Sequence, residues 1–270
     1  MAKLKKAITL ETTFGPYAID ELLGEGGAGR VFGGASSEGA KVAIKVLSAD
    51  KVTTDKRRRF KNEISFLARN RHPNIVSVID HGIAALNDVS GPFYVMKRYD
   101  ANLREVMRAG LPAQELLPLF SKILDGVEAA HLQGALHRDL KPENVLFDRA
   151  SKTPLIADFG VASFTDDIVA TAVETGPTQR LANFMYAAPE QRTPGRQAGP
   201  QADIYALGLM LNEMFTSNVP HGTEYQTIGQ ANPQFGFLDA IVAKMIRQAP
   251  GERYATIPSR ADNLKTFDLI

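Results

Sequence analysis

The hydrophobic pattern of this chain changes its period near Lys97, and that change constrains the fold more than any other feature. Before it, short runs of strand-forming residues are separated by turn residues, with one helical stripe among them. After it, most apolar residues recur at helical spacing. The pattern therefore predicts an α+β protein with a small β-rich lobe, residues 1–97, and a larger, mostly helical lobe, residues 98–270.

The same periodicities place the elements along the chain. The first lobe is expected to contain five strands and one main helix. The strands are predicted at residues 14–23, 30–34, 41–47, 75–79 and 93–96, and the helix at residues 54–70. In the second lobe, helices are predicted at residues 116–131, 204–215 (opened by Asp203), 238–246 and from Ile257 onward. Residues 218–237 form a short, Gly/Pro-rich segment.

Composition and charge exclude several classes of protein. The net charge of +1 argues against nucleic acid or an anionic membrane as the main partner. The chain contains no cysteine, which excludes disulfides, thiolate metal sites and a cysteine nucleophile, and fits a reducing compartment. No signal peptide is recognisable, and no apolar run approaches the roughly 18 residues of a membrane span. The expected location is therefore the cytoplasm.

A glycine-rich segment separates the first two predicted strands. Gly24, Gly26 and Gly29 fit the pattern G-x-G-x-x-G. Strand-like residues follow the glycines, whereas a dinucleotide-binding fingerprint requires a helix there. The segment predicts a flap whose backbone N–H groups can approach phosphates closely, with an ordinary glycine-rich hairpin as the alternative.

A lysine interrupts the next apolar strand, which reads Val42-Ala43-Ile44-Lys45. Such a lysine either lies at an edge or faces a polar site. Glu63 lies beside the apolar stripe of the following helix, so it can turn inward and pair with Lys45.

The densest group of functional side chains is residues 137–144, His-Arg-Asp-Leu-Lys-Pro-Glu-Asn. This stretch combines acidic, basic and amide side chains in a single loop before a short apolar run. Asp158-Phe159-Gly160 follows it, and then an irregular segment rich in Thr, Ala and Gly. Long segments of this kind in compact domains usually have a function.

Taken in order, these motifs resemble the signature set of the eukaryotic-like (Hanks-type) serine/threonine protein kinases. The resemblance runs from about Phe14 to beyond Arg253. It implies the bilobal protein-kinase fold, with an ATP cleft between the lobes. The matching residues are Gly24/Gly26/Gly29, Val42–Lys45, Glu63, His137–Asp139 with Asn144, Asp158–Gly160 and Ala188-Pro189-Glu190.

The resemblance implies a role for each polar residue in phosphoryl transfer, where a protein mainly positions groups and neutralises charge. Lys45, oriented by Glu63, would hold the ATP phosphates. Asp158 and Asn144 would bind Mg²⁺ or Mn²⁺, as hard oxygen ligands for a hard cation. Two residues in the loop would act on the acceptor: Asp139 would take or orient the hydroxyl proton, and Lys141 would contact the γ-phosphate, which favours Ser/Thr over Tyr. The implied ATP contacts are Gly24, Gly26, Gly29, Val31, Ala43, Lys45, Glu63, Met96 and Leu146.

Other matching residues are expected to be structural. Asp203 would accept backbone N–H groups of the loop at 137–144, and Glu190 would form a buried ion pair with Arg253. His137 is expected to pack and not to act as a base. An apolar column is implied for Leu67, Val78, His137 and Phe159.

The irregular segment is expected to be an activation loop. Arg138 would pair with a phosphate on it. Candidate acceptors are Thr171, Thr175 and Thr178, and a transient homodimer would allow autophosphorylation. The chain departs from the family at Asn183, where serine/threonine kinases usually carry threonine. In the short segment at residues 218–237, a compact or missing helix would remove a docking surface that the family usually has.

The resemblance implies a protein kinase that acts on protein substrates of unknown identity. Two alternatives to this function are open. One is a pseudokinase, an ATP-binding scaffold; the presence of Lys45, Asp139, Asn144 and Asp158 argues against it. The other is a small-molecule phosphotransferase of kinase-like fold, against which Lys141 and the Ala-Pro-Glu segment count.

Overall fold

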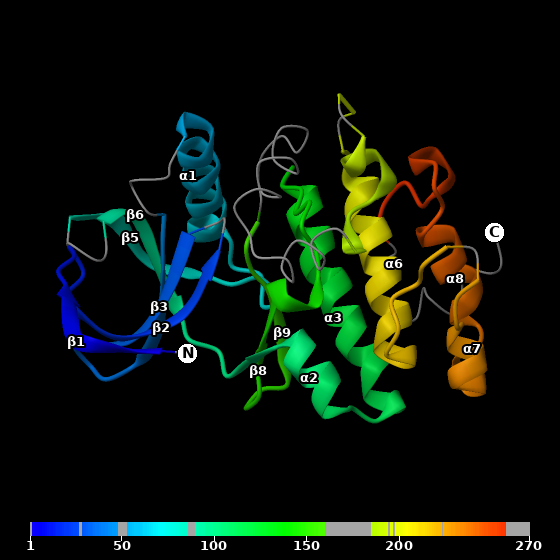
Figure 1. The fold of residues 1–270 in the computed structure, drawn as a ribbon, viewed down its shortest axis with the longest axis horizontal. Coiled ribbons are helices and arrows are strands. Elements are labelled where there is room, and N and C mark those ends of the chain that lie inside the picture. Colours follow the sequence, from blue (N-terminus) through cyan, green and yellow to red (C-terminus); the bar gives the residue numbers. More distant parts are fainter. Residues whose placement is uncertain are drawn as a thin grey trace. The chain divides into compact units, whose positions relative to one another are not determined.

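A computed structural model of the chain is shown in Figure 1. It describes residues 2–26, 29–47, 53–85, 90–159, 185–193, 195–196, 198–222 and 224–257. The chain divides into two compact units. The first contains Met1–Arg71 and Ile75–Arg98, and the second contains His72–Asn74 and Tyr99–Ile270.

The first unit is an antiparallel sheet with one described helix. The sheet has six strands in the order β1-β2-β3-β4-β6-β5. Its elements are β1 (Ala2–Leu10), β2 (Tyr17–Gly26), β3 (Gly29–Ser36), β4 (Lys41–Val46), β5 (Val78–Ala85), β6 (Ser90–Lys97) and α1 (Thr54–Arg69). Thr53 begins the helix, because its side chain accepts a hydrogen bond from the backbone N–H of Lys56.

One face of this sheet forms an apolar core. The core includes Leu10 from β1 and Ala84 from β5, the two end strands, so the sheet curls around it. A hydrogen bond of 2.5 Å from Thr12 Oγ1 to Asp80 Oδ2 links the same two regions. The other core residues are Tyr17, Ile19, Phe32, Val42, Ile44, Val46, Phe93 and Val95.

The observed sheet differs from the predicted one by an additional strand and by the position of β5. The sheet has six strands and not five, because the lysine-rich β1 precedes the expected first strand. The strand predicted at residues 75–79 begins at Val78 and continues to Ala85. Ile75 and Val76 are buried but lie outside β5, so their apolar character reflects packing and not membership of that strand.

The second unit is mostly helical. Its helices are α2 (Leu103–Ala109), α3 (Ala113–Leu132), α6 (Pro200–Thr216), α7 (Ile228–Ala231) and α8 (Leu238–Met245). A small sheet has the order β7-β8-β9, formed by β7 (Ala101–Asn102), β8 (Val145–Asp148) and β9 (Thr153–Ile156). Short 3₁₀ helices lie at Pro142–Asn144, Pro189–Arg192, Pro233–Phe235 and Pro250–Glu252.

Helix α6 is the most buried element of this unit, since every residue from Ala202 to Thr216 is buried. It starts four residues before the predicted position: Gly199 is its N-cap, Pro200 its first residue, and Asp203 lies in the first turn. Proline suits this place because the first helical N–H has no intrahelical partner. Asp203 is thus free of a capping role and can bond to another segment.

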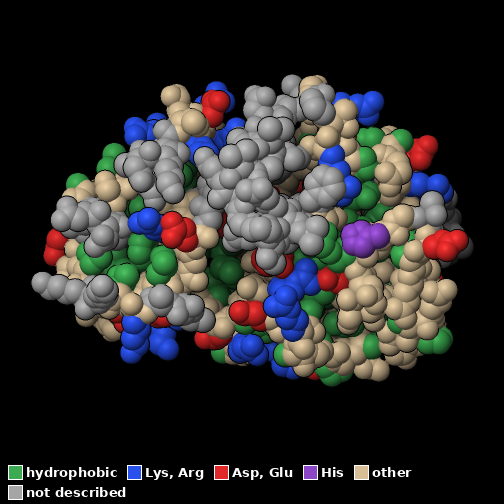
Figure 2. Space-filling model, in the orientation of Figure 1, with side chains coloured by type: hydrophobic (Ala, Val, Ile, Leu, Met, Phe, Trp, Pro, Cys, Tyr) green, Lys and Arg blue, Asp and Glu red, His purple; other side chains and the backbone are tan. Residues whose placement is uncertain are grey.

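In the described part of residues 218–237, the structure contains the one-turn helix α7 and one 3₁₀ helix. The helix predicted from Ile257 lies outside the described residues. On the face shown in Figure 2, acidic and basic side chains are interspersed over the described surface. None of the helices that the structure describes is long and apolar enough to cross a bilayer.

Candidate active site

The strand register gathers predicted residues on one face of the first sheet. Val31 of β3 lies opposite Lys45 of β4, and Ala43 of β4 lies opposite Met96 of β6. Residues directly opposite each other share a face, as do alternate residues of one strand. These four side chains therefore project from the face opposite the apolar core. The backbone of Gly24 is paired with Val31 at the edge of the group.

Lys45 and Glu63 form the predicted ion pair. The Lys45 Nζ atom lies 2.9 Å from Glu63 Oε1 and 3.2 Å from Oε2. Only 3% of the Lys45 side chain and 8% of the Glu63 side chain are exposed. The Tyr94 hydroxyl, opposite Lys45 in the register, donates a 3.0 Å hydrogen bond to Glu63 Oε1. Tyr94 was not predicted, because its role depends on the pairing of β4 with β6.

The glycine-rich segment contains one position that only glycine can occupy without a backbone shift. Gly29 has a φ of 115°, and a Cβ there would lie 2.3 Å from the carbonyl oxygen of Val46. Gly24 has open space around its Cα hydrogens. Gly26 and Gly29 pair across the turn between β2 and β3.

In the second unit, Asp139, Lys141 and Asn144 form one cluster. Lys141 Nζ lies 3.0 Å from Asp139 Oδ2. The Asn144 Nδ2 atom donates to Asp139 Oδ2 at 3.0 Å and to the Asp139 carbonyl oxygen at 2.8 Å. Because the amide nitrogen is used in this way, the Asn144 Oδ1 atom remains available for another partner.

Asp203 holds the backbone of this loop, as predicted. Its Oδ2 atom accepts the N–H of His137 at 2.9 Å, and its Oδ1 atom accepts the N–H of Arg138 at 2.7 Å. Arg138 has a φ of 63°, which is unfavourable for a residue with a Cβ. Gln191, which was not predicted, donates a 2.7 Å hydrogen bond to the Arg138 carbonyl oxygen. Bonds on both sides of Arg138 thus stabilise its conformation.

A histidine on α3 completes the surroundings of Asp203. His131 Nε2 lies 2.7 Å from Asp203 Oδ2. Burial opposes ionisation of Asp203, but the hydrogen bond from His131 and the nearby His137 outweigh it and lower the pKa of this carboxyl. His131 appears in the sequence only as the polar end of a helical stripe, so nothing indicated this contact.

His137 is a packing residue, as predicted. Its side chain is fully buried, and its ring centroid lies 4.8 Å from that of Phe159. Nε2 lies 2.7 Å from the carbonyl oxygen of Ala157, and Nδ1 accepts the N–H of Asp139 at 3.3 Å. Both ring nitrogens are therefore engaged by backbone. The other proposed members of the apolar column, Leu67 and Val78, belong to the first unit, and their part in it stays a prediction.

The donor set suits magnesium. Asp158, with a φ of 59°, directly precedes the buried Phe159, and Asn144 offers an amide oxygen. Within the described ranges no three His, Cys, Asp or Glu side chains are grouped so that they could hold a metal. Mg²⁺ is usually bound by one or two carboxylates together with water and substrate phosphates, so one carboxylate and one amide oxygen are a suitable protein contribution.

A second polar cluster joins the loop to α6. Arg104 of α2 donates to Glu143 Oε1 at 2.8 Å, to the Tyr186 hydroxyl at 2.7 Å, and also to Glu213. Tyr186 donates to Glu213 in turn, and burial raises the pKa of the Tyr186 hydroxyl. This cluster was not predicted, since Arg104 and Glu213 are 109 residues apart.

The ion pair predicted between Glu190 and Arg253 is present and buried. Arg253 Nη1 lies 2.7 Å from Glu190 Oε1, and Nη2 lies 2.9 Å from Oε2. The Arg253 side chain is fully buried and that of Glu190 is 4% exposed. Arg253 also lies over the Tyr205 ring, 4.8 Å from its centroid. The pair therefore has the two-point geometry that makes arginine–carboxylate contacts strong.

Several predicted residues are not placed. Thr171, Thr175, Thr178 and Asn183 lie outside the described residues. Leu146, the remaining predicted ATP contact, is described by the structure: it is half-buried in β8, opposite Leu155 of β9.

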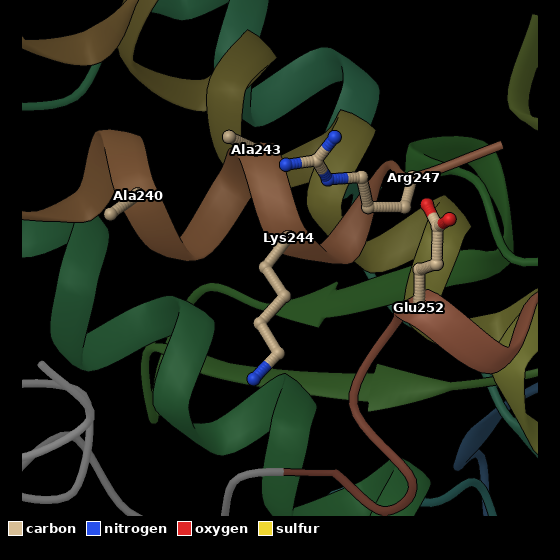
Figure 3. Close-up of a pocket in the computed structure, with 5 residues that line it drawn as sticks. All are labelled: Ala240, Ala243, Lys244, Arg247 and Glu252. Atoms are coloured by element: carbon tan, nitrogen blue, oxygen red, sulfur yellow. The ribbon is translucent and has the colours of Figure 1, made fainter. Parts of the chain in front are cut away.

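A pocket in the second unit lies at residues that were not predicted to be functional. In Figure 3 the Lys244 side chain extends away from those of Arg247 and Glu252. Lys244 Nζ lies 4.4 Å over the centroid of the Tyr254 ring. The pocket is lined by Ala240, Ala243, Lys244, Arg247 and Glu252.

Comparison with known proteins extends over nearly the whole chain. A family model described as the protein kinase domain matches residues 17–261. The serine/threonine-protein kinase pkn3 of Myxococcus xanthus is 31% identical over 217 residues, which are 76% of this chain and 38% of that protein. The probable serine/threonine-protein kinase PknB of Corynebacterium glutamicum is 29% identical over 92% of this chain and 41% of its own length.

Among solved structures, the crystal structure of the Mycobacterium tuberculosis PknI kinase domain aligns with a TM-score of 0.70 at 26% identity. The alignment covers 96% of this chain and 99% of that one. The chain spans about two fifths of the length of the curated relatives that it matches.

Proposed function

We propose that this chain, which belongs to the protein kinase family, transfers the γ-phosphate of ATP to Ser/Thr hydroxyls of protein substrates. Its fold is the bilobal protein-kinase fold, as the sequence predicted. We assign the region up to about residue 97 to the N-lobe, which holds ATP, and the remainder to the C-lobe. The observation that carries the proposal is the cluster of Asp139, Lys141 and Asn144.

Asp139 is proposed to take or orient the proton of the substrate hydroxyl. Its Oδ2 atom already receives hydrogen bonds from Lys141 and Asn144. Its Oδ1 atom accepts none from the described part of the chain, and the side chain is 32% exposed. One carboxylate oxygen is thus fixed by the protein, while the other can meet a hydroxyl.

The two lysines are proposed to bind phosphate. The Lys45 ammonium is buried and oriented by Glu63, so it is a fixed positive charge on the sheet face that carries Val31, Ala43 and Met96. Lys141 places a second ammonium beside Asp139, where the γ-phosphate would meet the hydroxyl. This placement supports Ser/Thr as the acceptor.

Asn144 and Asp158 would hold Mg²⁺ or Mn²⁺. The bound metal would neutralise charge on the ATP phosphates during transfer. The chain itself orients Asn144, because two hydrogen bonds to Asp139 turn the amide nitrogen inward.

Autophosphorylation of the activation loop is proposed as the means of control, with Thr171, Thr175 and Thr178 as acceptors and a transient homodimer as the reacting species. The Arg138 Nε atom is buried and has no hydrogen-bond partner in the described residues, which supports an anion as its partner. Mass spectrometry after incubation with ATP would detect phosphate on these threonines. Absence of phosphate from residues 163–178 would contradict this part of the proposal.

A cytoplasmic location and protein substrates are part of the same proposal. The lack of cysteine supports the location, since it fits a reducing compartment. The net charge of +1 supports protein over nucleic acid as the substrate, since a strong positive field would favour nucleic acid.

The decisive test is transfer from radioactive ATP to a serine- and threonine-rich protein such as casein. Asp139→Asn is expected to lower kcat by about 10²–10⁴-fold, the range for loss of a general base. Asp148→Asn, at the end of β8, is the matched control and should keep full activity, because an amide oxygen can still accept the N–H of Ala150. Label that appears on phosphotyrosine only, or equal rates for Asp139→Asn and the native chain, would overturn the proposal.

A further inference from the structure

A row of residues on one face crosses four strands of the first sheet. Glu21 of β2 lies opposite Gly33 of β3, Gly33 opposite Ala43, and Ala43 opposite Met96. Because opposite residues share a face, the row lies on the same face as Lys45. The row therefore extends from the proposed ATP contacts Ala43 and Met96 toward β2.

An ion pair occupies the Glu21 end of this row. The Arg98 Nη1 atom bonds to Glu21 Oε1, and the two side chains are 25% and 21% exposed. A Cβ added to Gly33 would lie 2.8 Å from Glu21 Cγ and 3.1 Å from Arg98 Nη1. Gly33 is not in the positive-φ region, so glycine provides space here and not backbone freedom. The ion pair thus lies directly over Gly33, next to Ala43.

The pair joins two distant parts of the chain. Glu21 lies three residues before Gly24, the first glycine of the flap. Arg98 is the last residue of the first unit, and its backbone N–H donates to the Lys41 carbonyl oxygen at 3.2 Å. The strand that enters the glycine-rich turn is therefore tied to the point where the chain leaves β6.

We propose that Glu21 and Arg98 are positioning residues for a purine nucleoside triphosphate, and that their ion pair limits the movement of β2 and the flap. The inference rests on the proposed binding of ATP to this face. Neither residue touches a reacting atom. The pair instead lies at the end of the row, beside the proposed ATP contacts Ala43 and Met96. It keeps β2, the strand that leads into the glycine-rich flap, in register with them.

The expected effect is on nucleotide affinity and not on the chemical step. A partly exposed ion pair contributes little to stability, because solvent screens it and both side chains lose freedom in forming it. Glu21→Gln and Arg98→Gln are each expected to raise the KM for ATP, and the Kd for a fluorescent ATP analogue, by about two- to fivefold, the range for loss of a partly exposed ion pair. The kcat value should stay within about twofold, because these residues act only on binding.

Gly33→Ala supplies an independent test that keeps both charges. Its methyl group would displace the Glu21 and Arg98 side chains, which can move without a backbone shift. It should raise the KM for ATP to a similar extent. The double variant Glu21→Gln/Arg98→Gln should be no weaker than either single variant, since all three lose one and the same interaction.

Thr12→Val is the matched control. It removes the hydrogen bond from the segment after β1 to Asp80 of β5, and should lower the melting temperature of the first unit without changing the KM for ATP. The inference is overturned if the native chain binds ATP but the effects of Glu21→Gln and Arg98→Gln add, or if Gly33→Ala leaves the KM unchanged. Failure of the native chain to bind any ATP analogue would instead overturn the proposed function together with this inference.

Discussion

Replacement of Asp203 by asparagine tests whether α6 maintains the geometry of the loop at 137–144. The Asp203 carboxylate accepts three hydrogen bonds: from Arg138 N at 2.7 Å, from His137 N at 2.9 Å, and from His131 Nε2 at 2.7 Å. The substitution keeps the size of the side chain but turns one acceptor into a donor. It therefore changes the hydrogen bonds while leaving the packing of α6 intact.

The size of the stability loss depends on which hydrogen bonds survive in Asp203→Asn. If the amide oxygen stays with Arg138, the amide nitrogen faces the N–H of His137, and two donors oppose each other. His131 can present its unprotonated nitrogen to the new amide, so that contact is retained. One bond to a charged acceptor is lost, about 1.5–3 kcal/mol, and a buried N–H is left unsatisfied. Because the two effects overlap, we expect a destabilisation of about 2–4 kcal/mol.

The substitution should also slow catalysis. Arg138 has a φ of 63°, and without both bonds from Asp203 it can relax and carry Asp139 with it. A displacement of about 1 Å at a reacting group can reduce the rate about 100-fold. We expect kcat to fall about 10–100-fold, with the KM for ATP little changed.

The assay combines thermal unfolding with steady-state kinetics. A loss of 2–4 kcal/mol in a unit of this size corresponds to a shift in Tm of about 5–15 °C. Asp239→Asn is the matched control: Asp239 accepts one backbone N–H, from Gly229 at 3.0 Å, which an amide oxygen can still accept. Wild-type stability and kcat in Asp203→Asn, or an equal loss in Asp239→Asn, would refute the reasoning.

Three further outcomes are expected. Arg253→Met should destabilise the chain by about 3–5 kcal/mol in urea unfolding, because it leaves the buried Glu190 carboxylate unpaired, whereas Glu190→Gln should cost less. The stability gap between the native chain and Asp203→Asn should be constant from about pH 8 to 4.5 and shrink at lower pH; a lowered carboxyl pKa contributes stability above its usual value of 3.8, which is lost as the pH falls through the folded pKa. Tyr186→Phe should lower the free energy of unfolding by about 1–2 kcal/mol, seen as a lower Tm, since Glu213 loses one buried donor but keeps another.

The sequence predicted best those contacts whose members are unusual for their settings. A lysine within an apolar strand and a glutamate beside an apolar helical stripe gave the pair Lys45–Glu63, which the structure contains. The bonds made by Asp203 and the pair Glu190–Arg253 were expected from the family's order of motifs. In each case a buried charge needs a partner, and few partners of opposite charge were available.

Where the sequence failed, the missing information was tertiary. Strand β1 carries lysines at positions 3, 5 and 6, which hide its alternation, and its stability comes from the ladder with β2. The start of α6 was misplaced because Pro200 at its first position continues an irregular segment as easily as it begins a helix. The part played by Tyr94 depends on the register between β4 and β6, which no local pattern specifies.

Two acids of α6, one whose contact was predicted and one whose contact was not, lead to one physical account of the loop. Asp203 bonds to residues 137 and 138 at the start of the loop, while Glu213, through Arg104, reaches Glu143 near its end. Both acids lie on α6, ten residues apart, which is about 15 Å along a helix. A buried helix of this kind is rigid, so it fixes the separation of its two attachment points. Helix α6 therefore holds the loop near both of its ends, and the bonds from Asp203 stabilise the unfavourable φ at Arg138.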